Sequence, residues 1–323
     1  MKSRRLVFDT RAAAWKVASQ MRGMREFAID WMRYRTYSSP TRVFDRSELG
    51  SDQLECQVTK EYHRIEKGLS LPAPRRPFGA EPKERLEALL PAHRGSVNGP
   101  DFSDNHSAEY EGLARQALVA LEDWNESGII NDAISPLLSS ITDFSGLDPE
   151  LAAELFTSRR SIRDFSDRPV AREKIADFVE IASNTPSVCN RQPWRVRIYS
   201  GQRVQEILAL HNGSAAFAMT IPHLAIVTVR TGLFSGSGER NQRWIDGGLF
   251  AMSLVWAAHS LGLGTCMLNW SRSNADTAKL RRVTSIREDE DVIVLIGFGY
   301  SAEETRVARS ERRGSKQILI FED

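Results

Sequence analysis

The sequence has few cysteines, no long uninterrupted apolar run and almost no net charge. Its three cysteines, Cys56, Cys189 and Cys266, stand apart, without the spacing of a disulfide framework or a metal site. We therefore expect a reducing compartment. The longest apolar stretch, from Trp244 to Leu263, is interrupted by an aspartate and a histidine, so no transmembrane helix is predicted.

The charge balance and the missing motifs exclude several classes of protein. The 43 basic and 42 acidic side chains leave a formal net charge of +1, which gives no overall footprint for nucleic acid. Charged and polar residues at the N-terminus leave no apolar segment of a signal peptide. The signatures of metalloproteases, α/β-hydrolases and P-loop proteins are absent from the sequence. We predict a cytoplasmic protein, with no nucleic-acid partner and no membrane contact.

Residues 1–150 show helical patterns and no strand pattern. Apolar residues between Phe8 and Tyr34 recur at three- and four-residue steps, which predicts a long amphipathic helix. This stripe favours docking on the same protein or a partner subunit, and a membrane surface is the alternative. We predict a helical N-terminal extension over 1–150. Its other helices are expected at 54–69, 81–90 and 108–124, with an extended connector at 72–79 and a polar loop at 93–106.

The pattern changes after Leu151, where strands begin to alternate with helices. Alternation from Trp194 to Ile198 predicts a half-buried strand. Continuous apolar runs predict further strands that are covered on both faces. An α/β or α+β domain with a central sheet is expected. These strands are predicted at 223–229, 292–298 and 318–321, a helical face at 175–182, and a helix buried on all sides at 244–261.

Three segments contain residues suited to a phosphate or a flat cofactor. Arg159 to Arg163 places three guanidiniums and a hydroxyl within five residues, which suits phosphate oxygens or a solvated surface. Thr185 to Trp194 offers carboxamides, which can bind a ligand or shape a turn. Glycines at 247–248 and 262–264 allow close approach of a helix or a ligand. Taken singly, each segment leaves both interpretations open.

In this order, the segments resemble the nitroreductase family of flavoproteins. The matching residues are Arg159-Arg160-Ser161-x-Arg163, Pro186-Ser187, Asn190-x-Gln192-Pro193-Trp194, Asp246-Gly247-Gly248, Gly262-Leu263-Gly264-Thr265-Cys266 and Arg312-Arg313. The runs 62–69 and 266–270 also resemble a long-chain subgroup found with bacterial surface-polysaccharide genes. The resemblance covers about half of the chain and leaves residues 1–150 unexplained.

The resemblance implies both a fold and a chemistry. The fold would be α+β, a three-layer sandwich with a central, mainly antiparallel sheet over 151–323, and a homodimer would hold FMN at its subunit interface. NADH or NADPH would reduce FMN, and a small organic acceptor such as a nitro compound or a quinone would then be reduced in a ping-pong cycle. Because the cofactor carries the chemistry, no catalytic residue and no metal ligand is predicted. The alternative is a catalytically quiet flavin-binding or scaffold protein that acts through its helical half.

The resemblance also implies residue roles. Arg159, Arg160 and Ser161, with Arg312 or Arg313, would form the phosphate site, and Arg163 would lie near the pyrimidine edge of the flavin. The flavin would be lined by Pro186, Ser187, Asn190 and Gln192, from the same or the partner subunit. The backbone at Leu268 and Asn269 would approach the reactive side of the ring, and Asn212 is a further candidate for a pyrimidine contact. The acceptor and the choice between NADH and NADPH are left open.

Overall fold

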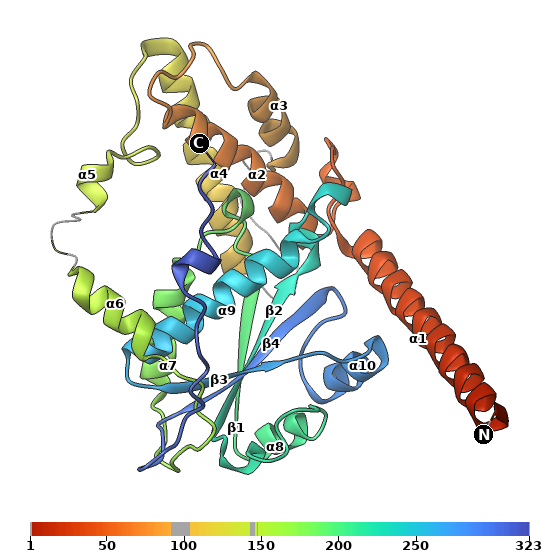
Figure 1. The fold of residues 1–323 in the computed structure, drawn as a ribbon. Coiled ribbons are helices and arrows are strands. Elements are labelled where there is room, and N and C mark those ends of the chain that lie inside the picture. The colour runs from red at the N-terminus through yellow and green to blue at the C-terminus, as the bar shows by residue number, and fades with distance from the viewer. Residues whose placement is uncertain (1, 92–103, 143–145, 147, 323) are drawn as a thin grey trace.

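The computed structural model describes residues 2–91, 104–142, 146 and 148–322. In this part of the chain, a helical N-terminal half precedes a domain built on one sheet (Figure 1). The strands are β1 (Trp194–Ser200), β2 (His223–Arg230), β3 (Gly264–Asn269) and β4 (Glu290–Gly299). The helices are α1 (Lys2–Tyr37), α2 (Ser51–Leu69), α3 (Ala80–Leu89), α4 (Asp104–Ser127), α5 (Leu138–Ile141), α6 (Pro149–Ser158), α7 (Arg172–Ser183), α8 (Gln202–Leu208), α9 (Gln242–Ser260) and α10 (Asn274–Val283).

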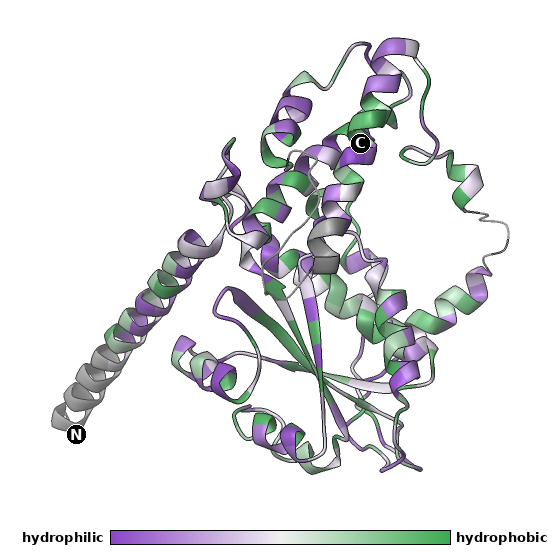
Figure 2. Cartoon of the chain, turned by 180° about the vertical axis from the view of Figure 1, so that it is seen from behind, coloured by the Kyte–Doolittle hydropathy of each residue, from purple (hydrophilic) through white to green (hydrophobic). Residues whose placement is uncertain are grey.

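The four strands form one antiparallel sheet in the order β1-β2-β4-β3. The two central strands, β2 and β4, carry the continuous apolar runs of the sequence and are almost entirely buried. Figure 2 shows green, hydrophobic stretches along these strands at the centre of the molecule. The predicted α+β fold with a mainly antiparallel sheet is confirmed.

Helices cover both faces of the sheet. On one face, α7 and α9 pack against β2 and β4 in a core that includes Phe178, Phe250 and Phe298. On the other face, α8 and α10 cover a second core, which contains Ile207 and Leu280. These layers form the predicted three-layer sandwich.

The contact between α9 and the sheet explains one glycine of the predicted motif. A Cβ at Gly247 would lie 2.5 Å from Cγ1 of Ile293 and 3.1 Å from Cγ1 of Val229. Such distances are too short for any other residue, so Gly247 lets α9 approach the strands closely. Gly248, in contrast, would meet no atom within 4 Å. At position 247 the glycine therefore serves helix packing.

The N-terminal half has a hydrophobic core of its own, formed by α2, α3 and α4. The long predicted helix is present as α1, and it extends away from the rest of the molecule (Figure 1). Its C-terminal third is docked: Tyr34 is buried, and the Arg33 guanidinium contacts the Asp291 carboxylate at 2.8 Å. The carboxylates of Glu26 and Asp30 also accept hydrogen bonds from Asn274 of α10. Trp15, Met24 and Phe27 are exposed. Among the described residues, no helix is long and apolar enough to cross a membrane.

Four expectations need correction or comment. Residues 318–321 form no strand and are exposed, because they pair with no strand of the described chain. The strand β3 was not predicted from the sequence. The helix α9 is not buried on all sides, since Trp244, Ile245 and Leu249 are 44–52% exposed. Most of the predicted loop 93–106 lies outside the described residues, and its end, 104–106, already belongs to α4.

Candidate functional site

The predicted phosphate-binding arginines gather beside the edge strand β3. Arg159 follows the last turn of α6, and its guanidinium lies 5.8 Å from the ring centroid of Trp256 on α9. Burial lowers the pKa of Arg159, and so do the nearby charges of Arg312 and Arg160. Arg160 and Arg312 therefore both lie close enough to Arg159 for their charges to act on it. We call Arg159, Arg160, Arg163 and Arg312 the arginine cluster.

The arginine cluster lacks acidic partners. Arg159, Arg163 and Arg312 form no ion pair with any residue that the structure describes, and Arg160 donates only to the carbonyls of Thr157 and Arg159. Concentrated positive charge without a counter-charge is unfavourable unless an anion binds. Guanidiniums match phosphate oxygens in geometry and charge. The cluster therefore fits the phosphate of FMN. Arg313, the other C-terminal candidate, is exposed and makes no polar contact with a described residue.

Ser161 and Arg163 are held against β3 by the backbone. Ser161 forms a parallel bridge with Thr265, and the Ile162 N–H donates to the Thr265 carbonyl at 2.9 Å. A Cβ at Gly264 would lie 2.7 Å from Cγ1 of Ile162, so the glycine allows this segment to lie close to the strand. The Arg163 guanidinium is 6.0 Å from the ring centroid of Phe217. The segment is thus fixed alongside the edge strand.

The other end of β3 holds the second group of predicted residues. Leu268 is buried in the core and Asn269 is exposed. His211 accepts the Gly213 N–H at Nδ1 (3.1 Å), so its Nε2 carries the proton and donates to the Asn269 carbonyl at 3.1 Å. Asn212 follows His211 and is exposed. The edge strand therefore connects the arginine cluster at its start with Asn212, Leu268 and Asn269 at its end.

The predicted residues Pro186, Ser187, Asn190 and Gln192 lie in the loop that enters β1, which we call the 186–192 loop. Its backbone is unusual, because Cys189, Asn190 and Gln192 all have positive φ (48°, 53° and 44°). This left-handed region is costly for residues other than glycine, and such conformations concentrate at ligand-binding sites. The Ser187 hydroxyl accepts the Gln192 N–H at 2.9 Å, which stabilises the turn.

Two buried charged residues hold the 186–192 loop in this conformation. Arg191 is fully buried and donates to both carboxylate oxygens of Glu239, at 2.8 and 2.7 Å. It also donates to Sγ of Cys56 on α2, at 3.3 Å. The Asp246 carboxylate on α9 accepts the Val188 N–H at 3.2 Å, and burial raises its pKa. The loop is therefore anchored to both halves of the chain.

The two groups of predicted site residues do not meet within one chain. In the order β1-β2-β4-β3, three strand spacings separate the 186–192 loop at β1 from the edge strand β3, or about 14 Å. The chain thus presents two half-sites, one along β3 and one at the entrance of β1. Among the described residues, no group of three histidine, cysteine or acidic side chains could hold a metal ion.

Sequence reasoning missed the residues that support each half-site. Arg191 lay inside the noted segment, but its ion pair with Glu239 and its contact with Cys56 depend on folding. His211 was not predicted as a site residue, although its hydrogen bond to the Asn269 carbonyl attaches the turn that contains Asn212 to β3. A charged residue between two polar site candidates is the signal that could have pointed to Arg191.

Comparison with known proteins leads to the nitroreductase family, the same family that the sequence motifs resemble. The model of the nitroreductase family matches residues 156–212 and 200–300. The chain is 31% identical to nitroreductase NfnB of Mycolicibacterium smegmatis, over 53% of this chain and 93% of that protein. It is 24% identical to 4-nitrobenzoate reductase of Pseudomonas putida, over 51% of this chain and 94% of that protein.

A solved structure gives a further match. It is an FMN-dependent nitroreductase from Clostridium difficile R20291, with a TM-score of 0.43 and 22% identity, and the match covers 53% of this chain and 99% of that one. The relative from Mycolicibacterium smegmatis is matched over nearly its whole length at more than 30% identity. The chain therefore belongs to the nitroreductase family of oxidoreductases.

Proposed function

We propose that this protein binds FMN and passes electrons from NADH or NADPH to a small organic acceptor in a ping-pong cycle. The observation that carries the proposal is the edge strand β3, which joins a cluster of unpaired arginines to the backbone at Leu268 and Asn269. The proposal assigns FMN binding to residues 151–323 and treats 1–150 as a helical extension. A cytoplasmic location and the long-chain subgroup remain predictions from the sequence.

The residues along β3 would bind and orient the cofactor. Arg159 and Ser161, with Arg312, would bind the phosphate through charge-assisted hydrogen bonds. Arg163 would place a cation near the pyrimidine edge, where negative charge accumulates during reduction. The backbone at Leu268 and Asn269 would lie against the ring, and the His211–Asn269 hydrogen bond would keep it in position. When bound, FMN would supply the hydride and electron chemistry.

A homodimer would bring the two half-sites together. The helix α9 exposes the apolar side chains of Trp244, Ile245 and Leu249, and exposed apolar residues grouped near one end of a helix are typical of a subunit interface. Because the 186–192 loop is anchored to the start of α9 through Asp246, contact between two copies of α9 would also position this loop. The partner's loop would then complete the site along β3.

Purification of the full chain tests the proposal. We expect a yellow protein with a flavin absorbance band that NADH or NADPH bleaches and that an added quinone or nitroaromatic restores. Protein that stays colourless after incubation with FMN would contradict the binding step. Bound flavin that no acceptor reoxidises would instead favour the alternative of a catalytically quiet flavin protein. Light scattering on the same sample measures whether the flavin-bound form is a dimer.

A further inference from the structure

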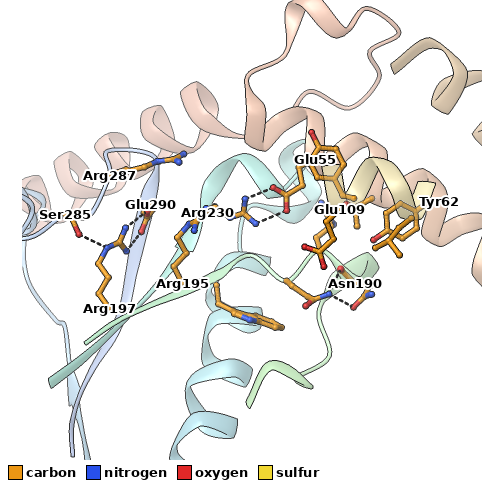
Figure 3. A pocket seen from close by; sticks show the side chains of 16 residues that line it. Glu55, Tyr62, Glu109, Asn190, Arg195, Arg197, Arg230, Ser285, Arg287 and Glu290 are labelled. Atoms are coloured by element: carbon orange, nitrogen blue, oxygen red, sulfur yellow. Dashed lines mark hydrogen bonds and ion pairs between the residues drawn. The ribbon is translucent and has the colours of Figure 1, made fainter. Parts of the chain in front are cut away.

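A cavity of about 840 Å³ lies between the helical N-terminal half and the sheet. Figure 3 shows its two walls, one formed by α2 and α4 and the other by the 186–192 loop, β1 and the ends of β2 and β4. Tyr62, Tyr110 and Trp194 contribute aromatic surface, which suits a flat organic molecule. The cavity has the size of a small-molecule site, and the N-terminal half supplies much of its lining.

Most of the charged side chains that line the cavity are paired, and Glu109 on α4 adds a further carboxylate to the lining. Arg197 pairs with both carboxylate oxygens of Glu290, at 2.6 and 2.8 Å, and Arg230 pairs with both oxygens of Glu55, at 2.5 and 2.8 Å. Two further arginines of the lining pair with carboxylates that lie outside it. Arg191 pairs with Glu239, and Arg287 pairs with Asp52 and Asp289.

Arg195 is the exception among the arginines that line the cavity. It forms no hydrogen bond and no ion pair with any described residue, and it lies on β1 between Arg197 and the Arg230–Glu55 pair (Figure 3). The Arg195 side chain is exposed to solvent at the cavity, and partial desolvation together with the nearby Arg230 charge lowers the pKa of this guanidinium. An anion in the cavity would offset both effects. A guanidinium binds a carboxylate through two parallel hydrogen bonds, so a carboxylate is the group that this position favours.

The cavity also adjoins a predicted flavin contact. Asn190 and Gln192 of the 186–192 loop line it, next to Trp194 at the start of β1. On the opposite wall, burial raises the pKa of Tyr62 to about 12, so its hydroxyl stays protonated and can donate a hydrogen bond at neutral pH. A ligand held here would have its charged end at Arg195 and its flat body near the loop.

We propose that this cavity is the acceptor-binding site and that its substrates are small organic acids, anchored by their carboxylate on Arg195. The assignment as an acceptor site rests on the proposed flavin function. Binding of the acid does not depend on turnover, and it can be measured separately. In this view the N-terminal half selects the substrate, because α2 and α4 close one side of the cavity.

The test compares 4-nitrobenzoate with its methyl ester, which lacks the charge. Binding of each probe to the purified full chain is measured by calorimetry, for the natural protein and for Arg195→Gln, Arg195→Lys and the control Arg203→Gln, which changes an exposed arginine on α8. We expect Arg195→Gln to weaken 4-nitrobenzoate about tenfold and to leave the ester unchanged, as for loss of one charge-assisted contact. Arg195→Lys should retain part of the affinity. Equal binding of acid and ester, or equal weakening of both, would overturn the proposal.

Half-reaction kinetics separate this inference from the proposed function. Arg195→Gln should slow reoxidation of the reduced protein by 4-nitrobenzoate and leave reduction by NADH or NADPH unchanged. If the variant slows only the reduction step, the cavity binds the anionic donor, and the acceptor assignment is wrong. A protein that binds 4-nitrobenzoate through Arg195 but never binds flavin would contradict the proposed function and would leave the acid-binding site intact.

Discussion

Replacing Arg191 with methionine tests how the 186–192 loop is held. The guanidinium is buried and donates to five acceptors. These are the carbonyls of Val188 (3.1 Å) and Leu233 (2.6 Å), Sγ of Cys56 (3.3 Å) and the two oxygens of Glu239 (2.7 and 2.8 Å). Methionine fills a similar volume without any donor, so the substitution removes the polar contacts and largely preserves the packing.

The expected loss of stability follows from the Glu239 carboxylate, which the substitution leaves without its guanidinium partner. Removing one partner of a buried ion pair costs about 3–5 kcal/mol, because the other charge stays buried without compensation. The Glu239 side chain is 26% exposed, so water partly replaces the lost guanidinium. We therefore expect the lower end of the range, about 3 kcal/mol of the free energy of unfolding. The strained backbone at Asn190 loses its support, so FMN affinity should fall as well.

Urea denaturation, followed by tryptophan fluorescence, measures this loss. Glu239→Gln and the double variant complete a cycle, in which the double variant should cost less than the two single losses together, by at least about 1 kcal/mol. As a control, Arg203→Met removes an exposed pair with Glu206 and should cost under about 1 kcal/mol. The reasoning fails if Arg191→Met costs no more than the control, or if the two single losses simply add.

Three further predictions concern the phosphate site, the subunit contact and acid stability. Arg159→Ala should lower FMN affinity about tenfold to a hundredfold, because it removes a charge-assisted hydrogen bond to the phosphate. Flavin fluorescence titration measures this affinity, and an unchanged value would show that Arg159 does not bind FMN. Leu249→Asp should convert a dimer into a 36.3 kDa monomer in light scattering, because it buries a charge in an apolar contact. Burial raises the pKa of Glu239, but its hydrogen bonds and ion pair with Arg191 outweigh burial and hold the pKa below its usual value. The stability from this pair should therefore be complete above about pH 4.5 and disappear as the pH falls through the lower, folded-state pKa, whereas Glu239→Gln should lack this dependence.

The sequence predicted the elements whose pattern of buried residues is regular along the chain. The strands β2 and β4 are continuous apolar runs because both of their faces are covered, and the helices of the N-terminal half have clear periodicity and stop signals. The strand β3 was missed because its sequence does not alternate between polar and apolar residues: the exposed Met267 is itself apolar, and a glycine opens the strand. The apolar residues 318–321 looked like a strand, although apolar character alone supplies no pairing partner.

The sequence predicts the candidate site as a set of residues but not their arrangement in space. Motif order predicted Arg159, Ser161 and Leu268 as site residues, and the structure bridges Ser161 to Thr265 of β3 and places Leu268 within that strand. Separation of these residues from the 186–192 loop depends on strand order, which local patterns do not encode. The anchoring by Arg191 depends on contacts that span 135 residues of sequence, so no local signal could reveal its partner on α2.

The pairing of Arg230 with α2 has a consequence for any shortened form of this protein. Arg230 ends the central strand β2, is 4% exposed, and finds its carboxylates on Glu55 and Asp52 of α2. A chain cut down to residues 151–323 would leave this guanidinium without a counter-charge, and Arg191 would lose its contact with Cys56. The two halves therefore share charged contacts across their boundary, and removal of α2 would take away the carboxylate partners of Arg230 at the end of β2.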